Sequence, residues 1–541
     1  MVNTTQINST EKKWLWAATI LLVFGHISHI NYYPINVGTD EGIRALVAME
    51  MNFTGDYIVP RLNGELYLNK PPLFNWILAL SFKIFGYTAF ALRLPTIISI
   101  FILGFLVFYF ARRYINEKVA WIAAFLYMTN GRSLIYDSML GYIDLTYAWV
   151  TFLGFMTVFV FGEKKQYYKL FIISYIIMSV GYLLKGFPSF GFQALTLLAY
   201  FIYTKNFKKL FHPAHFTGVF VFLLIVGGYY LLYFNKTDMQ PAALFKNLLS
   251  ESTQRTPFFH DVGLFFKHLI KYPYELIYHY GPGMYFFILL LRKDWMQVIR
   301  SNRFVLFCAI IFAANILIYW LSPKIFARYI FMHLALLFTV FAYFYFISAA
   351  NDIRKKILNT FFLVVAILFF IVCFFLPFYR LTKVVDQPLL KSAILIPAFG
   401  FVIWHMIRKP QYRIVHTFML IAIFRVGFNW FVFVQRGQEN VVAENDGKRI
   451  AEITKGQPLF IQGRPFNHSL GSIGDKNATS FNIAKHRKDI IRFNDSIRYD
   501  AFYLTSPDSV INLPHTLYYK FDNPEIDSAI LIKFIPPSDN K

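Results

Sequence analysis

Residues 357–377 read ILNTFFLVVAILFFIVCFFLP and include no charged side chain. A run of this length and composition is typical of a helix that crosses the hydrocarbon core of a bilayer. The whole chain has the same character, because 57% of its 541 residues are hydrophobic, 20% are aromatic and only 15% are charged. This composition excludes a soluble multidomain protein and predicts an all-α polytopic membrane protein.

Thirteen apolar stretches have about the length of a membrane span. They lie at 14–31, 90–111, 119–136, 144–162, 170–185, 188–204, 213–234, 278–291, 304–321, 328–347, 357–377, 389–407 and 414–434. Basic clusters lie between them at 12–13, 112–113, 164–165, 205–209, 292–303, 354–356 and 408–413. All of these clusters fall on one side of a thirteen-span arrangement, so the positive-inside rule places them and the N-terminus in the cytoplasm. An even number of spans would break this alternation.

The formal net charge of +23 belongs to the membrane part of the chain. Residues 436–541 hold fourteen Lys or Arg and thirteen Asp or Glu, so they contribute almost nothing to it. The excess is therefore an orientation signal for the membrane, and we expect no nucleic-acid partner.

The composition divides the chain into a transmembrane domain, 1–435, and a soluble α/β domain, 436–541, on the outer face. In the second domain we expect helices at 440–455 and 485–499, and strands at 458–462, 501–504, 516–521 and 529–535.

The thirteen-span arrangement leaves the candidate chemistry on the outer face. This face holds the segment 32–89, where amphipathic helices on the membrane are expected, and three shorter turns. The turns carry Asp137 with Asp144, Lys185, and Lys324. A transporter more often places its ionisable residues near the bilayer midplane, where Arg425 is the clearest candidate.

The residue types on this face suit group transfer from a lipid phosphate. A carboxylate such as Asp40 or Glu41 can accept a proton from an acceptor hydroxyl or amine. Cations can bind a phosphate and stabilise the charge that develops as it leaves. The cations available for this are Arg44, Lys70, Lys185, Lys324 and Arg328.

The first outer segment resembles that of the ArnT-like glycosyltransferases, which are GT-C enzymes related to the protein O-mannosyltransferases. The matching stretches are Asp40-Glu41, the segments 55–64 (GDYIVPRLNG) and 67–76 (YLNKPPLFNW), and Arg93-Leu94-Pro95. Leu184-Lys185-Gly186, Ser322-Pro323-Lys324 and Arg328-Tyr329 resemble later motifs of this family in the same order.

The resemblance implies a fold, a reaction and a set of roles. The fold is a GT-C bundle in the bacterial inner membrane, with the active site and the tail on the periplasmic side. The enzyme would move a sugar from polyprenyl (undecaprenyl) phosphate to an acceptor such as lipid A, another glycan or a protein. Asp40 would be the essential carboxylate, as base or as orienter of the acceptor. Lys70 and Arg328 would hold the donor phosphate, with Tyr67 and Tyr329 lining the same pocket.

Two positions depart from the family pattern. Asn69 stands where ArnT has a glutamate, and Ser252 stands where it has a histidine; in ArnT these positions bind zinc. The resemblance therefore implies no certain cofactor here, and a divalent metal held with His260 or His268 stays an alternative.

Several of these residues have a structural alternative. Asp40 and Glu41 suit the N-terminus of a helix, where acidic side chains are favourable. Lys70 and Lys185 suit snorkelling at the end of a span. Asp137 and Asp144 are seven residues apart, so they share a helix face if the helix is continuous and are turn or cap residues if it is not. Arg425 suits either a lipid phosphate or a buried acid as its partner.

Two other functions also stay open. A transporter or flippase of lipid-linked sugars would depend chiefly on residues such as Arg425. A non-catalytic scaffold would depend on the tail at 436–541.

Overall fold

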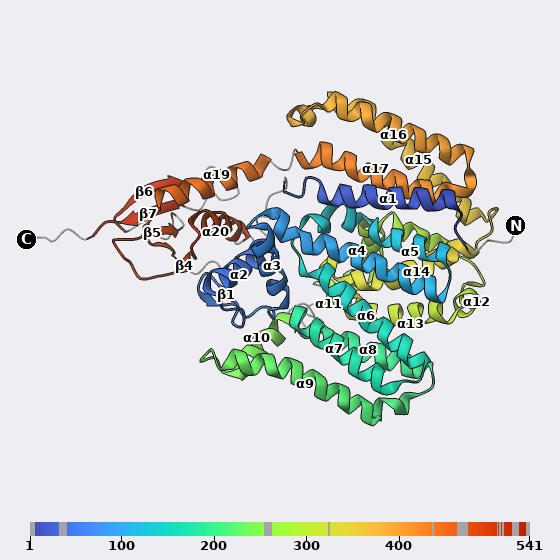
Figure 1. The fold of residues 1–541 in the computed structure, drawn as a ribbon, viewed down its shortest axis with the longest axis horizontal. Coiled ribbons are helices and arrows are strands. Elements are labelled where there is room, and N and C mark those ends of the chain that lie inside the picture. The colour runs from blue at the N-terminus through green and yellow to red at the C-terminus, as the bar shows by residue number, and fades with distance from the viewer. Residues whose placement is uncertain are drawn as a thin grey trace, which may run out of the picture.

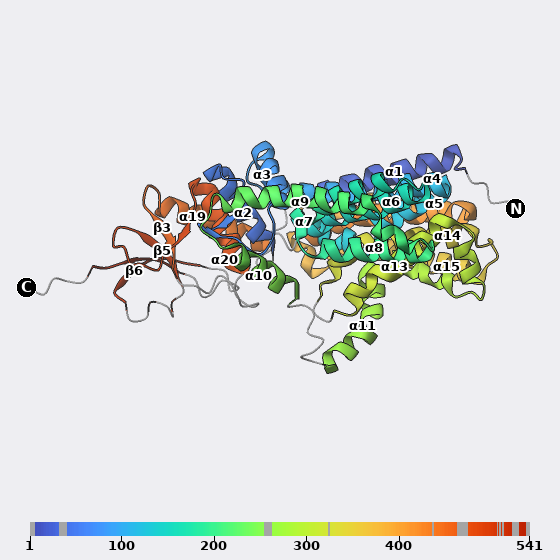
Figure 2. The same ribbon diagram turned by 90° about the horizontal axis from the view of Figure 1, so that it is seen from below.

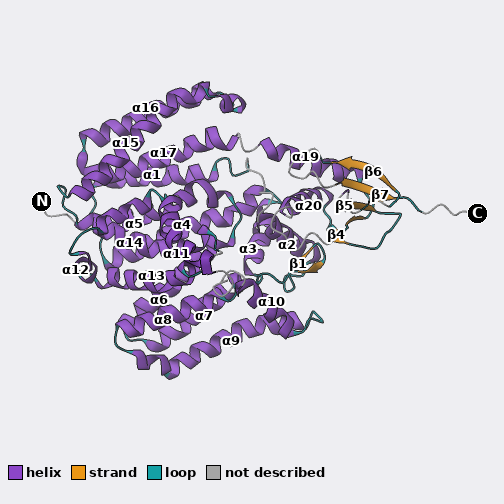
Figure 3. Cartoon of the chain, turned by 180° about the vertical axis from the view of Figure 1, so that it is seen from behind, coloured by secondary structure: helices purple, strands orange, loops and turns teal. Residues whose placement is uncertain are grey.

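The computed structural model describes residues 6–31, 40–253, 262–322, 325–434, 438–462, 474–505, 507, 510, 513–521 and 530–536. Long helices form a bundle, and the strands gather at one end of the molecule (Figures 1 and 3). Among the described residues, nine helices are long and apolar enough to cross a membrane. The chain is therefore a multi-pass membrane protein.

The bundle has the following helices in chain order: α1 (Ser9–Ile27), α4 (Ala89–Tyr114), α5 (Glu117–Met128), α6 (Ile143–Glu163), α7 (Tyr167–Lys185), α8 (Pro188–Tyr203), α9 (Pro213–Phe234), α13 (Arg303–Trp320), α14 (Phe331–Ile347), α15 (Ile353–Phe375), α16 (Pro388–Arg408) and α17 (Arg413–Phe428). Shorter or peripheral helices are α2 (Asp40–Thr54), α3 (Leu73–Phe85), α10 (Pro241–Thr253), α11 (Val262–Tyr280) and α12 (Trp295–Arg300). Figure 2 shows α11 projecting from the side of the bundle.

Nine of the thirteen expected spans coincide with the nine long apolar helices. The stretches at 14–31 and 188–204 correspond to α1 and α8, and 119–136 divides into α5 and a π-helical turn at Arg132–Tyr136. The stretch at 278–291 is not one helix, because α11 ends before Gly281-Pro282 and a 3-10 helix follows at Gly283–Leu290. Proline lacks the N–H that would continue the helix. The count of thirteen spans stays a prediction.

The segment after α1 forms two amphipathic helices, α2 and α3, joined through a short hairpin. Strands β1 (Arg61–Leu62) and β2 (Glu65–Leu66) pair antiparallel across Asn63-Gly64. Both turn residues have positive φ, 54° and 84°, which is the conformation that favours Asn-Gly in two-residue hairpin turns.

The C-terminal part forms a mixed five-stranded sheet in the order β4-β3-β5-β7-β6, with helices α19 (Gln438–Ile453) and α20 (Gly474–Arg487). Its strands are β3 (Leu459–Ile461), β4 (Arg492–Phe493), β5 (Phe502–Thr505), β6 (His515–Lys520) and β7 (Ile530–Phe534). β3 runs parallel to β4 and β5, whereas β7 is antiparallel to β5 and β6. The expected helix near 440–455 and the four expected strands are confirmed.

The helix expected at 485–499 is wrong. α20 ends at Arg487, because Lys488 takes a left-handed conformation (φ 57°) and its N–H bonds back to the carbonyl of Ala484 at 2.8 Å. Such a residue ends a helix. Arg492 and Phe493 pair instead as strand β4 at the edge of the sheet.

The C-terminal part contacts the segment that holds the β1–β2 hairpin and α3. The backbone N–H of Phe493 donates to the carbonyl of Asn63 at 3.1 Å, and the rings of Phe82 and Phe481 lie 5.8 Å apart. Figure 1 shows α2, α3 and the strands at one end of the bundle and the N-terminus at the other. The sheet and the segment that carries Asp40 and Lys70 therefore share one end of the molecule.

Candidate functional site

Four charged side chains meet where helices end. Nη2 of Arg328 lies 3.3 Å from Oδ2 of Asp40, and its Nε lies 3.1 Å from Oδ2 of Asp144. The other oxygen of Asp144 accepts from Nζ of Lys185 at 2.5 Å. Arg328 thus joins Asp40 to Asp144, and Asp144 joins Arg328 to Lys185. We call these four residues the charged cluster.

The elements that carry the charged cluster explain why it forms. Asp40 is the first residue of α2, Asp144 is in the first turn of α6, and Lys185 is the last residue of α7. Acidic groups are favourable at helix N-termini and basic groups at C-termini. Arg328 lies in the 3-10 turn Ala327–Ile330 that leads into α14. Four segments that are distant in the sequence therefore bring charge to the same end of the bundle.

The charged cluster is buried on one side and open on the other. The side chains of Asp144, Lys185 and Arg328 are only 6%, 7% and 11% exposed, whereas that of Asp40 is 55% exposed. Charges with so little contact with water are costly unless they are paired. The carboxylate of Asp40 is the part of the cluster that water or a substrate can reach.

Aromatic rings surround the two cations. The guanidinium carbon of Arg328 lies 4.4 Å from the ring centre of Tyr142 and 4.2 Å from that of Phe326. Nζ of Lys185 lies 3.8 Å from the ring centre of Tyr329. These rings exclude water and stabilise the cations through cation–π contacts. Lys185 does not snorkel to an interface, since it is buried against Asp144 and Tyr329.

Glu41 and Arg93 set the position of α2. Arg93 donates to both carboxylate oxygens of Glu41, at 2.8 and 3.0 Å, and both side chains are fully buried. Glu41 also accepts from the backbone N–H of Gly141 at 2.8 Å, and Arg93 donates to the carbonyl of Ile30 at 2.9 Å. The pair thus connects the end of α1, the start of α2, α4 and the segment before α6. Glu41 holds the scaffold, while its neighbour Asp40 faces the open side.

Arg44 approaches the charged cluster from one turn further along α2. It is close enough to act electrostatically on Asp144, and its guanidinium carbon lies 5.5 Å from the ring centre of Tyr67. Arg44 is 3% exposed, and its Nη1 is buried without a hydrogen-bond partner in the described part of the chain. One nitrogen of Arg44 therefore lacks a protein acceptor in the described part of the chain.

Lys70 lies in a half-buried loop beside the end of α7. The ring of its neighbour Pro71 is 3.9 Å from the position that a Cβ on Gly186 would occupy, and Gly186 follows Lys185 directly. Gly186 has φ 81°, a conformation that glycine adopts without strain. The close approach brings the loop of Lys70 next to the charged cluster.

Asp137 is separated from Asp144 by a break in the helix. It lies in a 3-10 turn, Asp137–Met139, and α6 begins only at Ile143. Its partner is Arg132, whose Nε and Nη2 lie 2.5 and 2.8 Å from the carboxylate oxygens. The two aspartates are therefore turn and helix-start residues. Arg132 and Tyr142 were missed in the sequence, although Arg132 lies only five residues before Asp137.

Arg425 does not pair with an acid among the described residues. It is buried and donates to the carbonyl of Gly25 at 3.0 Å and to that of Leu134. Its Cγ would lie 2.8 Å from a Cβ on residue 25, which only glycine avoids. Arg425 thus links α17 to α1 and to the 131–136 turn through backbone carbonyls. Lys324 and His260 lie outside the described residues.

The residues at the family's zinc positions do not fit zinc. Asn69 offers an amide where zinc sites use Cys, His or carboxylate ligands. The side chain of Ser252 lies outside the described part, and His268 already contacts the carbonyl of Tyr319 at 3.3 Å. Within the described residues, no group of three or more His, Cys, Asp or Glu side chains is placed to hold a metal. We derive no step of the reaction through a metal.

An apolar cavity of about 410 Å³ borders the 131–136 turn, which carries Arg132. Its lining comes from the 131–136 turn, α11, α15, α16 and α17, and includes Leu134, Tyr136, His279, Phe361, Phe369 and Phe424. Tyr280, next to His279, donates a hydrogen bond to the carbonyl of Ala327, the residue before Arg328. Tyr280 thus connects α11, which lines part of the apolar cavity, to the turn that carries Arg328.

Comparisons with known proteins show which family and fold this chain is similar to. Residues 69–230 match the family of dolichyl-phosphate-mannose-protein mannosyltransferases. Undecaprenyl phosphate-alpha-4-amino-4-deoxy-L-arabinose arabinosyl transferase 2 of Proteus mirabilis is 27% identical over 208 residues, and the corresponding transferase of Aeromonas hydrophila is 26% identical over 202 residues. Each match covers 36% of this chain and 36% of the relative, so the chain spans about a third of the length of these relatives.

The fold extends the match to nearly the whole chain. The crystal structure of ArnT from Cupriavidus metallidurans bound to undecaprenyl phosphate aligns with a TM-score of 0.65 and 16% identity, over 97% of this chain and 99% of that one. At this identity the alignment establishes the fold only. Together, the family match, the arabinosyl transferase relatives and the shared fold show that this chain is similar to the ArnT-like GT-C glycosyltransferases.

Proposed function

We propose that this protein transfers a sugar from a polyprenyl phosphate to an acceptor at the outer face of the bacterial inner membrane. The observation that carries the proposal is the bridge that Arg328 makes between the accessible Asp40 and the buried Asp144. In this proposal Asp40 is the base and Arg328 the phosphate-binding cation, and the two side chains lie within hydrogen-bonding distance of each other. We assign this chemistry to residues 1–435, with the active site and residues 436–541 on the periplasmic side.

The balance of charge supports an anionic donor. Three cations, Arg44, Lys185 and Arg328, face two carboxylates, Asp40 and Asp144. A phosphate would balance the excess and would give the buried Nη1 of Arg44 an acceptor. The neighbouring loop adds Lys70 to the same region, with Tyr67 and Tyr329 as walls.

The surroundings of the site suit a lipid-borne phosphate. The apolar cavity next to Arg132 and Tyr280 can hold part of a polyprenyl chain, while the phosphate reaches the charged cluster. The sugar would then extend toward Asp40. Two relatives are named for an undecaprenyl phosphate-linked sugar, and the ArnT structure of the same fold was determined with undecaprenyl phosphate.

In the reaction that we propose, the oxygen of an acceptor hydroxyl, or the nitrogen of an acceptor amine, attacks the anomeric carbon. Asp40 accepts the proton of this acceptor group or orients it. The bond from that carbon to the phosphate oxygen breaks, and the polyprenyl phosphate leaves with the electron pair. Arg328 and Lys70 stabilise the developing negative charge. Asp144 and Lys185 hold Arg328 in place, and the Glu41–Arg93 pair holds the start of α2.

The test compares envelope lipids and glycoproteins by mass spectrometry from cells with and without this chain, and from cells that carry Asp40→Asn. We expect one sugar modification to require the wild-type chain and to be lost in Asp40→Asn. The matched control is Glu65→Gln, which removes an exposed carboxylate of the same outer segment. Full modification by Asp40→Asn would overturn the proposed mechanism.

A further inference from the structure

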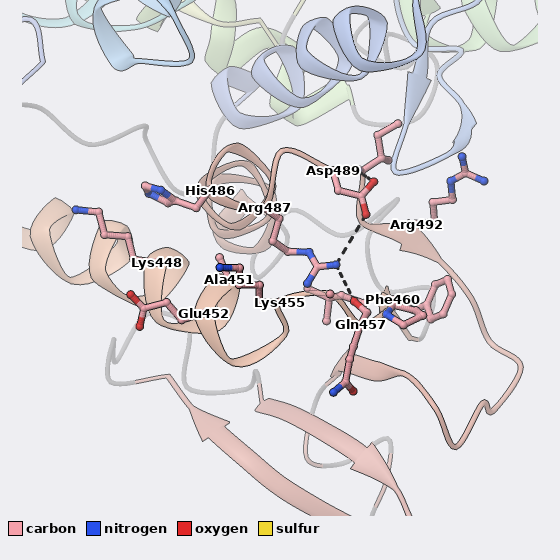
Figure 4. Close-up of a pocket in the computed structure, with 14 residues that line it drawn as sticks. Lys448, Ala451, Glu452, Lys455, Gln457, Phe460, His486, Arg487, Asp489 and Arg492 are labelled. Atoms are coloured by element: carbon pink, nitrogen blue, oxygen red, sulfur yellow. Dashed lines mark hydrogen bonds and ion pairs between the residues drawn. The ribbon is translucent and has the colours of Figure 1, made fainter.

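A polar cleft of about 870 Å³ opens in the C-terminal part (Figure 4). It lies between the ends of α19 and α20 and the beginnings of β3 and β4. Five basic residues line it: Lys448, Lys455, His486, Arg487 and Arg492. Its acidic residues are Glu452 and Asp489, so basic groups predominate. We call it the basic cleft.

The two acids of the basic cleft have cationic partners. Glu452 lies 3.6 Å from Arg449, one turn away on α19, and Asp489 lies 3.8 Å from Arg487. In contrast, Lys448 and Lys455 have no carboxylate within ion-pairing distance in the described part of the chain. The cleft therefore has positive charge that its own acids do not neutralise.

The shape of the basic cleft is fixed from within. Arg487 donates to the carbonyl of Thr454 at 2.5 Å and to that of Gln457 at 2.8 Å. These bonds hold the turn 454–457, which Gly456 makes possible with φ 73° and which presents Lys455. In Figure 4, Lys448 and His486 come from neighbouring helices on one side, and Arg492 lies on the other. A preorganised turn lowers the entropic cost of binding a ligand.

We propose that the basic cleft binds an anionic carbohydrate, a sugar that carries phosphate or carboxylate. Its volume is in the range of small-molecule sites and exceeds the need of a lone phosphate ion. Lysines at its rim complement an anion, while the side-chain amide N–H groups of Gln457 can donate to sugar hydroxyls.

The basic cleft is connected to the candidate active site. The side chain of Arg492 packs on Gly64, where a Cβ would lie 3.3 Å from its Cγ, and Phe493 donates to the carbonyl of Asn63. The chain continues from this hairpin to Tyr67 and Lys70. If the proposed transferase activity holds, the cleft is placed to retain an anionic acceptor near the reaction. This role rests on the proposed function, whereas the binding itself does not.

The experiment measures binding by isothermal titration calorimetry to the full-length protein in nanodiscs of neutral lipid. The probes are glucose 6-phosphate, glucose and inorganic phosphate. We expect glucose 6-phosphate to bind more tightly than either of the others. The double variant Lys448→Glu/Lys455→Glu should weaken this binding by about tenfold or more, because repulsion replaces two favourable charge contacts.

Lys520→Glu is the matched control, since Lys520 is an exposed lysine on β6, at the opposite edge of the sheet. It should bind glucose 6-phosphate like the wild type. Lys448→Gln/Lys455→Gln, which removes charge without reversing it, should give an intermediate loss and guards against misfolding of the first variant. Asp40→Asn should bind the probe normally, so failure of transfer and failure of binding are distinguishable.

Three results would overturn the proposal. They are absence of glucose 6-phosphate binding, equal binding by Lys448→Glu/Lys455→Glu and the wild type, and inorganic phosphate binding as tightly as the sugar phosphate. The last result would exclude recognition of the carbohydrate.

Discussion

The guanidinium of Arg328 lies 3.3 Å from the carboxylate of Asp40, although 288 residues separate them in the sequence. The same guanidinium contacts Asp144, which is 6% exposed and bound to Lys185. Thus Nε of Arg328 contacts the buried Asp144, while its Nη2 contacts the accessible Asp40. A cation held in this way can bind a phosphate without further reorganisation, which is the condition for strong electrostatic stabilisation of a leaving group.

Replacing Arg328 by lysine should reduce kcat/KM for sugar transfer by about 10²- to 10³-fold, because lysine keeps the charge but cannot contact Asp40 and Asp144 together. The measurement is the rate of transfer from a polyprenyl phosphate sugar in proteoliposomes. Arg303→Lys is the control, since Arg303 is an exposed arginine that pairs with Glu163 at 2.7 Å. Equal rates for Arg328→Lys and Arg303→Lys would contradict the assigned role.

Replacing Arg44 by methionine should raise KM for the lipid donor by about tenfold while the melting temperature stays equal or rises. The buried Nη1 of Arg44 has no hydrogen-bond partner in the described part, so replacing Arg44 removes a desolvation cost from the protein without donor. In the protein with bound donor, the same replacement removes a proposed contact to the phosphate. Donor-dependent initial rates and thermal unfolding in detergent measure the two effects. A large loss of stability with unchanged KM would assign Arg44 a structural role instead.

Glu41→Gln should destabilise the protein by about 3–5 kcal/mol, because it leaves the guanidinium of Arg93 buried without its counter-charge. The melting temperature in detergent should fall well below that of the wild type. The exposed Glu65→Gln should melt like the wild type. If both variants melt together, the Glu41–Arg93 pair does not hold α2 as we infer. Glu41→Leu/Arg93→Met should recover part of the loss, since it removes both buried charges.

Glu50 should make the contact between α2 and the hairpin sensitive to pH. Burial raises the pKa of the Glu50 carboxyl from its ordinary 4.5 to about 7, even though the backbone N–H of Gly64 donates to it at 3.0 Å. Between these two values the folded protein keeps a proton that the unfolded chain releases. The contribution of protonated Glu50 to the free energy of unfolding is therefore complete below about pH 4.5, and it is lost as the pH rises through about 7.

Glu50→Gln should remove this dependence, because the amide stays neutral and its oxygen can still accept from Gly64. Between pH 5 and 8 the free energy of unfolding of the variant should rise relative to that of the wild type, by about 3 kcal/mol at most. Thermal unfolding and hydrogen exchange of residues 61–66 across this range are the measurements. A difference between variant and wild type that stays constant with pH would contradict the expectation, and Glu65→Gln should show none.

Much of the architecture follows from the sequence because spans depend on local composition. Uninterrupted apolar runs predicted the positions of the long helices. Asn63-Gly64 has the residue types that its hairpin turn requires. The same local reasoning failed at 485–499, where the left-handed Lys488 ends α20 and Arg492 and Phe493 pair as β4. The strand forms because its backbone bonds to β3, which is distant in the sequence. The pattern of apolar residues within 485–499 gives no information about such a partner.

The sequence by itself determined a multi-pass membrane protein with acids and cations in the segment after its first helix, because apolar length and charge are properties of the residues alone. Only the tertiary structure decided which charges meet. Asp40 and Glu41 are adjacent, yet the turn of α2 directs one to the open side and the other into a buried pair with Arg93. Asp144, Lys185 and Arg328 come together because three helices end at the same level of the bundle, a packing relationship that no short stretch of sequence encodes.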